Sequence, residues 1–185
     1  YRPILQAAKH LANSQGAALF ETHKRLDKVL FDSPPDHSGP YNTGFREPQT
    51  LGDLKGLLRQ QPSANLIAGG TDLMLEVTQK QGRFDQLISL ARVLELQRLE
   101  INADGAIIGS AVTYQDLQAA AELRWPALHH FLSRLGSPQI RNRGTIGGNL
   151  GTASPIGDLL PILLAMDATI VMSHFEEADQ KVPIS

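Results

Sequence analysis

Two glycine-rich stretches carry the residues whose types and spacing could bind a ligand. The longer one, residues 141–158, has five glycines among threonine, serine and asparagine side chains, and is here called the long segment. Because glycine lacks a Cβ, backbone N–H groups beside it can approach a ligand and form a concavity that attracts anions. The hydroxyls and the amide can bond phosphate oxygens, and the carboxylate of Asp158 is an acceptor suited to a sugar diol. This composition predicts a site for a phosphate-bearing ligand.

The shorter stretch is AGGTD, residues 68–72, here called the short loop. It lies between a predicted buried strand, residues 65–68, and a predicted helix, residues 72–79, for which Thr71 is the candidate N-cap. A helix start carries free N–H groups and the positive end of the helix dipole, which favour phosphate. The alternative for both stretches is a tight turn, which is the usual role of paired glycines. We expect Asp72 to interact with the helix dipole and not with an anion.

No arrangement of side chains predicts acid–base, nucleophilic or metal chemistry by this chain. No nucleophile has a neighbouring histidine, and no pair of carboxylates has suitable spacing. The chain has no cysteine, so it can form no disulfide and supplies no thiolate ligand for an iron–sulfur cluster. His129 and His130 are adjacent and therefore face different sides of a helix, which does not make an i, i+4 metal pair. We expect no metal site.

The composition indicates a chain of one domain or two small ones, with 185 residues and a formal net charge of −2. This charge predicts no general attraction to nucleic acid or to an anionic membrane. The longest apolar stretch, residues 159–172, is interrupted by Pro161 and Asp167 and is too short to span a bilayer. The sequence begins with Tyr1 and shows no signal peptide, so we expect a fragment or processed piece of a cytoplasmic protein.

The chain is expected to change character near residue 44. Residues 1–9 read as the start of a helix, and residues 31–43 are rich in proline and glycine, which is typical of a linker. From Phe45 the pattern becomes α/β. Thr50 and Asp53 form a predicted capping box for a helix that starts at residue 51 and is ended by Pro62, and residues 86–90 form the next buried strand. Strand, helix and strand in this order indicate a small parallel unit.

The second half of the sequence has an antiparallel and helical pattern. Residues 100–113 predict a hairpin with its turn at residues 102–105. Thr113 and Pro126 mark the starts of two helices, the second of which ends at Gly136. Residues 159–166 predict a helix, residues 168–172 a strand, and residues 174–181 an exposed turn. The fold class that follows is α+β.

Residues 66–73 (LIAGGTDL) and 136–158 (GSPQIRNRGTIGGNLGTASPIGD) resemble the two pyrophosphate-binding signatures of the FAD-binding domain in molybdenum hydroxylases. Neither stretch has the spacing of a Rossmann or Walker motif, so the resemblance and not the spacing names FAD. It extends to about residue 172. It implies two α/β subdomains: a small three-stranded parallel unit over about 45–101, and a larger antiparallel sheet with helices over 102–185. It also implies that a C-terminal domain is absent from this sequence.

The resemblance also implies the FAD-binding residues. The pyrophosphate would be held by backbone N–H groups of residues 68–71 and by Thr145, Gly148 and Asn149, and the ribose by Asp158. Leu135 would pack against the flavin ring without stacking on it. Two interpretations stay open for Arg141 and Arg143. Their guanidinium groups either contact phosphate or lie in solvent at the edge of a strand. The full set of expected site residues is Leu66, Ile67, Ala68, Gly69, Gly70, Thr71, Asp72, Leu73, Leu135, Thr145, Gly148, Asn149 and Asp158.

In this family the flavin performs the chemistry and the protein positions it. Residues 1–5 resemble the segment that follows the last cluster-ligating cysteine in xanthine dehydrogenases, which implies an iron–sulfur domain upstream. Electrons would pass from a purine at a separate molybdenum centre, through iron–sulfur clusters and FAD, to NAD. A molybdenum-binding subunit would be the partner in a hetero-oligomer. The alternatives are an FAD subunit of the carbon monoxide, nicotinate or aldehyde dehydrogenase type, and a non-redox nucleotide-binding module of the same fold.

Overall fold

The computed structural model describes residues 44–102, 105–173 and 178–184. The predicted N-terminal helix and linker, residues 1–43, lie outside the described residues, and so does the resemblance to xanthine dehydrogenases at residues 1–5. The tip of the predicted hairpin and part of the predicted C-terminal turn lie outside them as well.

A three-stranded parallel sheet forms the first part of the described chain. Its order is β1-β3-β2, with Phe45 paired to Leu87 and Leu66 paired to Ile88. Two helices and a 3₁₀ turn connect or follow these strands. This sheet confirms the predicted small parallel unit. Its elements are β1 (Gly44–Arg46), α3 (Leu51–Gln60), β2 (Asn65–Ile67), α4 (Met74–Thr78), β3 (Gln86–Ser89) and η1 (Leu94–Gln97).

Helix α3 begins at the predicted capping box. The Thr50 hydroxyl accepts a hydrogen bond from the backbone N–H of Asp53 at 3.1 Å, and the Asp53 carboxylate accepts one from the backbone N–H of Thr50 at 3.3 Å. Such a cap stabilises a helix by about 1 kcal/mol. The helix then buries Leu54 against Ile88 and Val93, which form a small core beside the sheet.

The antiparallel part differs from the prediction. Among the described residues the strands form two separate two-stranded ladders and not one larger sheet. The second strand of the second ladder begins within the predicted exposed turn, residues 174–181, and continues beyond it. Its residues are all exposed, so no buried face marks it in the sequence. The strands are β4 (Leu99–Ile101), β5 (Ala106–Ile108), β6 (Thr169–Met172) and β7 (Gln180–Pro183).

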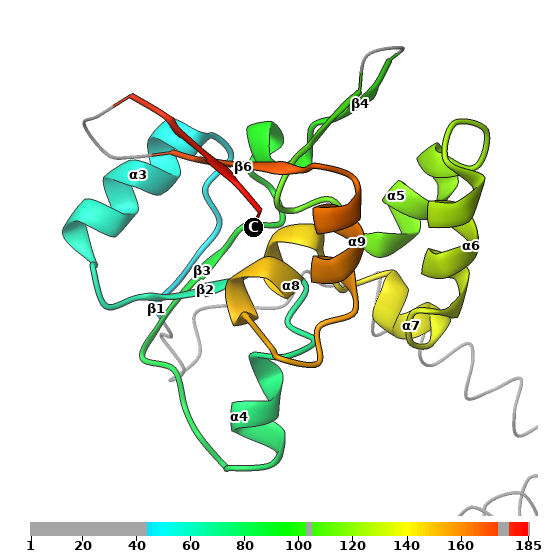
Figure 1. The fold of residues 1–185 in the computed structure, drawn as a ribbon. Helices are drawn as coiled ribbons and strands as arrows, with labels where there is room; N and C mark the ends of the chain where they lie inside the picture. The colour runs from blue at the N-terminus through cyan, green and yellow to red at the C-terminus, as the bar shows by residue number, and fades with distance from the viewer. Residues whose placement is uncertain (1–43, 103–104, 174–177, 185) are drawn as a thin grey trace, which may run out of the picture. The chain divides into compact units, whose positions relative to one another are not determined.

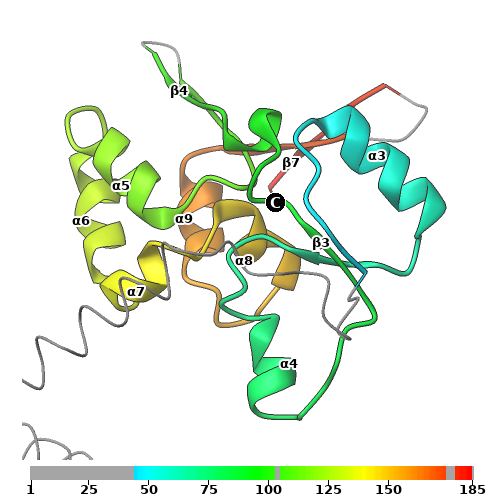
Figure 2. The same ribbon diagram turned by 180° about the vertical axis from the view of Figure 1, so that it is seen from behind.

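Five helices surround the main hydrophobic core. Helices α5 and α6 pack side by side, and α8 and α9 lie between them and the parallel sheet (Figures 1 and 2). Leu117, Leu132 and Leu159 are fully buried in this core. Among the described residues, no helix combines the length and the apolar character needed to cross a membrane. The helices are α5 (Tyr114–Ala121), α6 (Pro126–Arg134), α7 (Pro138–Arg141), α8 (Ile146–Thr152) and α9 (Leu159–Ala165).

Candidate functional site

The short loop turns the chain sharply between β2 and α4. Gly70 has φ of +74°, a left-handed conformation that glycine adopts at no steric cost. Thr71 is not the N-cap that the sequence predicted. Helix α4 begins later, with Leu73 at the N-cap position and no side-chain capping bond. Residues 71–73 instead form a turn, and α4 projects away from the other helices (Figures 1 and 2).

The backbone donors of the short loop have no acceptors within the described part of the chain. No hydrogen bond there uses the N–H groups of residues 68–72, although the loop carbonyls of Gly70 and Asp72 accept bonds from Met74 and Leu75. Buried or ligand-facing N–H groups are almost always paired in proteins, so a run of unpaired donors indicates either water or a ligand as partner. Successive N–H groups of this kind suit an anion.

The long segment contains a helix that the sequence analysis did not predict, because residues 146–152 form helix α8. Thr145 is its N-cap, and its hydroxyl accepts from the N–H of Gly148 at 3.1 Å. Three further acceptors complete the first turn: Val112 for Ile146, Ser110 for Gly147 at 2.9 Å, and the Thr145 carbonyl for Asn149 at 3.1 Å. The bonds to Val112 and Ser110 are tertiary, and they offset the low helix propensity of glycine.

The two glycine-rich stretches therefore differ in what they offer a ligand. The N–H groups of Gly148 and Asn149 already have protein acceptors, whereas those of the short loop have none in the described residues. Thr145 and Thr113 form an isolated antiparallel β-bridge, and the backbone N–H of Thr145 has no acceptor in the described residues. Gly148 is helical and does not have a positive φ.

The short loop and the long segment meet directly. A Cβ built on Gly69 would lie 1.6 Å from the carbonyl oxygen of Arg143 and 3.1 Å from the backbone nitrogen of Gly144. Both stretches also line a cavity of about 460 Å³, to which the start of α5 contributes. The convergence expected from the sequence is thus present in the structure. The polar residues lining the cavity are Gln97, Thr113, Asp116, Arg143 and Thr145, and the short loop contributes Ala68 and Gly69.

Two acceptors of the long segment have no donor in the described residues. The Oδ1 atom of Asn149 is buried, accepts no hydrogen bond, and lies 3.5 Å from where a Cβ on Gly157 would be. Asp158 occupies the N-cap position of α9, but its side chain is exposed and makes no capping bond. A buried unpaired acceptor costs free energy, about 1–3 kcal/mol, unless a ligand or water supplies the donor.

Leu135 is the C-cap of helix α6, and Arg141 of α7 bonds the chain there. The Arg141 guanidinium donates from Nη1 to the carbonyl of Gly136 at 2.9 Å and to that of Leu135 at 3.5 Å. Arg141 lies in α7, so it is not on a strand edge, and its charge is directed to the C-terminal carbonyls of α6. Leu135 is half-buried against the main core.

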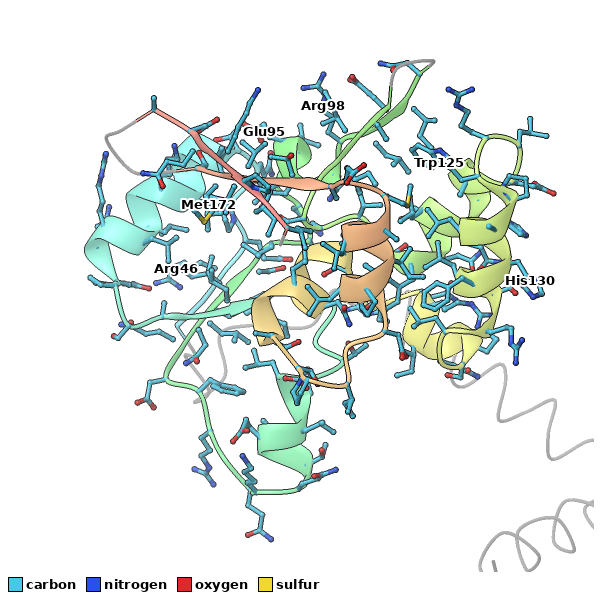
Figure 3. All side chains as sticks on the ribbon, in the orientation of Figure 1. Arg46, Glu95, Arg98, Trp125, His130 and Met172 are labelled. Atoms are coloured by element: carbon cyan, nitrogen blue, oxygen red, sulfur yellow. The ribbon has the colours of Figure 1, made fainter. Side chains whose placement is uncertain are left out.

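The remaining expected residues lie on the elements around the short loop. Leu66 and Ile67 are in β2, where Leu66 is exposed and Ile67 half-buried, and Leu73 precedes α4. His130 points outward from α6, while Nδ1 of His129 lies 2.8 Å from the carbonyl of Gln118 (Figure 3). In the part of the chain that the structure describes, no group of His, Cys, Asp or Glu residues is arranged to hold a metal ion.

Tyr114 packs against the long segment, a contact that the sequence did not reveal. Its ring lies against Gly144, where a Cβ would be 2.5 Å from Cε2, and its N–H donates to the Gly144 carbonyl at 3.0 Å. Burial raises the pKa of the Tyr114 phenol, a hydrogen bond with the Asn149 amide lowers it, and the negative charge of Asp158 raises it. The sequence shows only the Thr113–Asp116 helix start here, so nothing in it marks Tyr114.

The family model described as "FAD binding domain in molybdopterin dehydrogenase" matches residues 41–185. The nicotinate dehydrogenase FAD-subunit of Eubacterium barkeri is 39% identical over 133 residues, covering 69% of this chain and 45% of its own length. The xanthine dehydrogenase FAD-binding subunit of Escherichia coli O157:H7 is 31% identical over 144 residues, covering 76% of this chain and 49% of its own.

Among solved structures, carbon monoxide dehydrogenase from Hydrogenophaga pseudoflava aligns with a TM-score of 0.70 and 28% identity, over 77% of this chain and 50% of that one. The chain belongs to the family of FAD-binding domains of molybdopterin dehydrogenases. It spans about half the length of the curated relatives it matches, at 45% and 49%.

Proposed function

We propose that the chain binds FAD through the short loop and the acceptors of the long segment. The observation that carries this proposal is the pair of complementary unpaired groups. The N–H groups of residues 68–72 are donors without acceptors in the described residues, and Asn149 Oδ1 is a buried acceptor without a donor. A dinucleotide needs both, because its phosphates accept hydrogen bonds and its sugar hydroxyls donate them.

The roles of the individual residues follow from this chemistry. The backbone of residues 68–71 and the N–H of Thr145 would hold the diphosphate. Gly148 would act through the fold of α8, since its own N–H is already bonded to Thr145. Asp158 and the Asn149 amide would accept from hydroxyls of the ligand. Leu135 would contact the flavin end by packing alone, and Leu66, Ile67, Asp72 and Leu73 would frame the loop.

Bound FAD would supply the redox chemistry, transferring electrons between one-electron and two-electron partners. This chain's residues would bind and orient the cofactor and would carry no acid–base step. In the complete enzyme we propose an iron–sulfur domain and a molybdenum-binding subunit as electron donors, in a hetero-oligomer, with NAD as acceptor. These partners are proposed for the whole protein and not for the described residues.

For the substrate of the complete enzyme we propose a purine, as in a xanthine dehydrogenase. The support is the resemblance of residues 1–5, which implies a cluster domain directly upstream. A second candidate is nicotinate, which is favoured by the 39% identity to a nicotinate dehydrogenase FAD-subunit. Substrate is chosen at a molybdenum site outside this chain, so the FAD-binding residues are compatible with either.

The experiment is an assay of the complete enzyme with xanthine and with nicotinate, using NAD or an artificial dye as electron acceptor. The full proposal is supported if the wild type reduces NAD with xanthine as substrate, and if Gly70→Val loses both FAD and NAD reduction but still reduces the dye. Activity with nicotinate alone selects the second candidate. NAD reduction that persists without FAD contradicts the electron-transfer role.

A further inference from the structure

Arg143 stands at the point where the short loop and the long segment meet. A Cβ added to Gly69 would lie 1.6 Å from the Arg143 carbonyl oxygen. Arg143 also lines the cavity of about 460 Å³, together with Ala68 and Gly69 of the short loop. Its side chain is exposed and makes no hydrogen bond or ion pair with the described residues. A free positive charge therefore lies beside the unpaired N–H donors of the short loop.

The backbone that carries this charge is held on both sides. The N–H groups of Arg143 and Gly144 both donate to the carbonyl of Ile140, at 3.1 and 2.6 Å. The next residue, Thr145, is paired with Thr113 across the isolated β-bridge. Only the side chain of Arg143 must be ordered when a ligand binds, which limits the entropy lost on binding.

The negative charges of the cavity region give a reason for a cation there. Asp116 lines the same cavity, and Asp72 belongs to the short loop. Like charges repel, so these carboxylates disfavour a doubly charged diphosphate unless a positive charge offsets them. Among the described residues that line the cavity, Arg143 is the only cation. Its guanidinium is a planar fork of N–H donors that matches two phosphate oxygens at once.

Arg141, two residues earlier, is placed differently. Its Nη1 atom donates to the carbonyls of Gly136 at 2.9 Å and Leu135 at 3.5 Å, and it is not among the residues that line the cavity. Its guanidinium is thus already directed to protein acceptors. The structure distinguishes two arginines that the sequence presents alike.

We propose that Arg143 binds the diphosphate of the dinucleotide and supplies the positive charge that the backbone donors of the short loop lack. This inference rests on the proposed binding of FAD and adds to it a side chain from the junction of the two stretches. The group that Arg143 recognises is the diphosphate, which FAD and ADP share, and not the flavin or adenine ring.

The test is a calorimetric titration of the full-length protein, freed of bound flavin, with FAD and with ADP. Arg143→Gln should weaken the binding of both ligands about ten- to hundredfold, the range for hydrogen bonds to a charged group. The loss should shrink as salt is added, because salt screens the charge pair in the wild type. The melting temperature of the ligand-free protein should not change. Arg143→Lys keeps the charge without the fork and should bind with intermediate affinity.

Two further variants control for charge and for position. Arg83→Gln removes an exposed arginine that does not line the cavity, and it should bind FAD as the wild type does. Arg141→Gln should weaken FAD binding less than Arg143→Gln. Wild-type affinity in Arg143→Gln, an equal loss in Arg83→Gln, or a larger loss in Arg141→Gln would overturn the assignment. So would a loss that is independent of salt and accompanied by a lower melting temperature.

The two ligands separate this inference from the proposed function. If the wild type binds ADP in an Arg143-dependent way but takes up no FAD, the diphosphate site stands and the FAD proposal fails. If the wild type binds FAD and Arg143→Gln binds it equally well, the FAD proposal stands and the role of Arg143 is overturned. A wild type that binds neither ligand overturns both.

Discussion

Gly69 of the short loop lies directly against the carbonyl group of Arg143. A Cβ on Gly69 would be 1.6 Å from the Arg143 oxygen and 2.4 Å from its carbonyl carbon, which no side chain can accommodate. The neighbouring Gly70 is required for a different reason, its φ of +74°. The paired glycines of the short loop therefore serve two functions: one lets the two stretches meet, and the other turns the chain.

Gly69→Ala is expected to destabilise the protein by forcing the short loop away from the long segment. The expected loss in the free energy of unfolding is about 1–3 kcal/mol or more, the range for steric overpacking. The matched control is Gly56→Ala in α3, where nothing lies within 4 Å of the added Cβ. That change should stabilise by about 0.5–1 kcal/mol. Urea unfolding of both variants measures the difference, and equal effects would contradict the loop contact.

Helix α8 offers a second matched pair of glycines. A Cβ on Gly147 would lie 2.4 Å from the Ser110 Cβ and 2.7 Å from its carbonyl oxygen, whereas nothing lies within 4 Å of one on Gly151. Gly147→Ala should therefore lower the melting temperature, and Gly151→Ala should raise it because alanine favours the helix by about 1 kcal/mol. A lower melting temperature for Gly151→Ala would contradict the helical assignment.

Asp158→Ala is expected to weaken FAD binding by about 1.5–3 kcal/mol, the range for hydrogen bonds to a charged group. Because its side chain makes no capping bond to α9, the FAD-free protein should keep its stability. Asp53→Ala is the control, since Asp53 belongs to the capping box of α3 and should affect stability alone. Calorimetric titration with FAD and thermal melting distinguish the two carboxylates. Loss of stability in FAD-free Asp158→Ala would remove the ribose assignment.

Local signals predicted several helix starts and one buried strand. Thr50 with Asp53 and Thr113 with Asp116 are short-range hydrogen-bonding patterns, and both mark helix starts in the structure. The buried strand β3 was predicted from its apolar run because burial on both faces leaves a continuous hydrophobic signal. The family signatures likewise predicted that the short loop and the long segment would meet.

The features that the sequence did not predict depend on distant contacts. Helix α8 contains three glycines and forms because Val112 and Ser110 supply acceptors for its first turn. Tyr114 packs against the long segment only because the fold brings it to Gly144. Arg141 was open between two interpretations: it lies in α7 and not on a strand edge, and its contact with phosphate stays a prediction. No local pattern encodes these relationships.

The stability of the protein in alkali should depend on Tyr114. Burial raises the pKa of the Tyr114 phenol in the folded protein above the ordinary value of 10.0, which applies to the unfolded chain. Between the unfolded and the folded pKa, the folded state therefore binds the proton more tightly than the unfolded state. The resulting stabilisation is complete below pH 10.0 and is lost as the pH rises through the folded pKa. Urea midpoints should therefore fall less steeply with pH in Tyr114→Phe than in wild type. Parallel pH curves for the two proteins would contradict the burial of an un-ionised phenol.

If the short loop and the long segment together hold FAD, the flavin content of the purified protein depends on the geometry of the short loop. Purified full-length protein is denatured and the released flavin is identified and quantified, for wild type, Gly70→Val and the control Gly56→Ala. We expect equimolar FAD in wild type and in the control, and none in a folded Gly70→Val, because a β-branched residue cannot keep φ of +74°. Wild type without FAD, or Gly70→Val with its full content, would contradict the proposed FAD site.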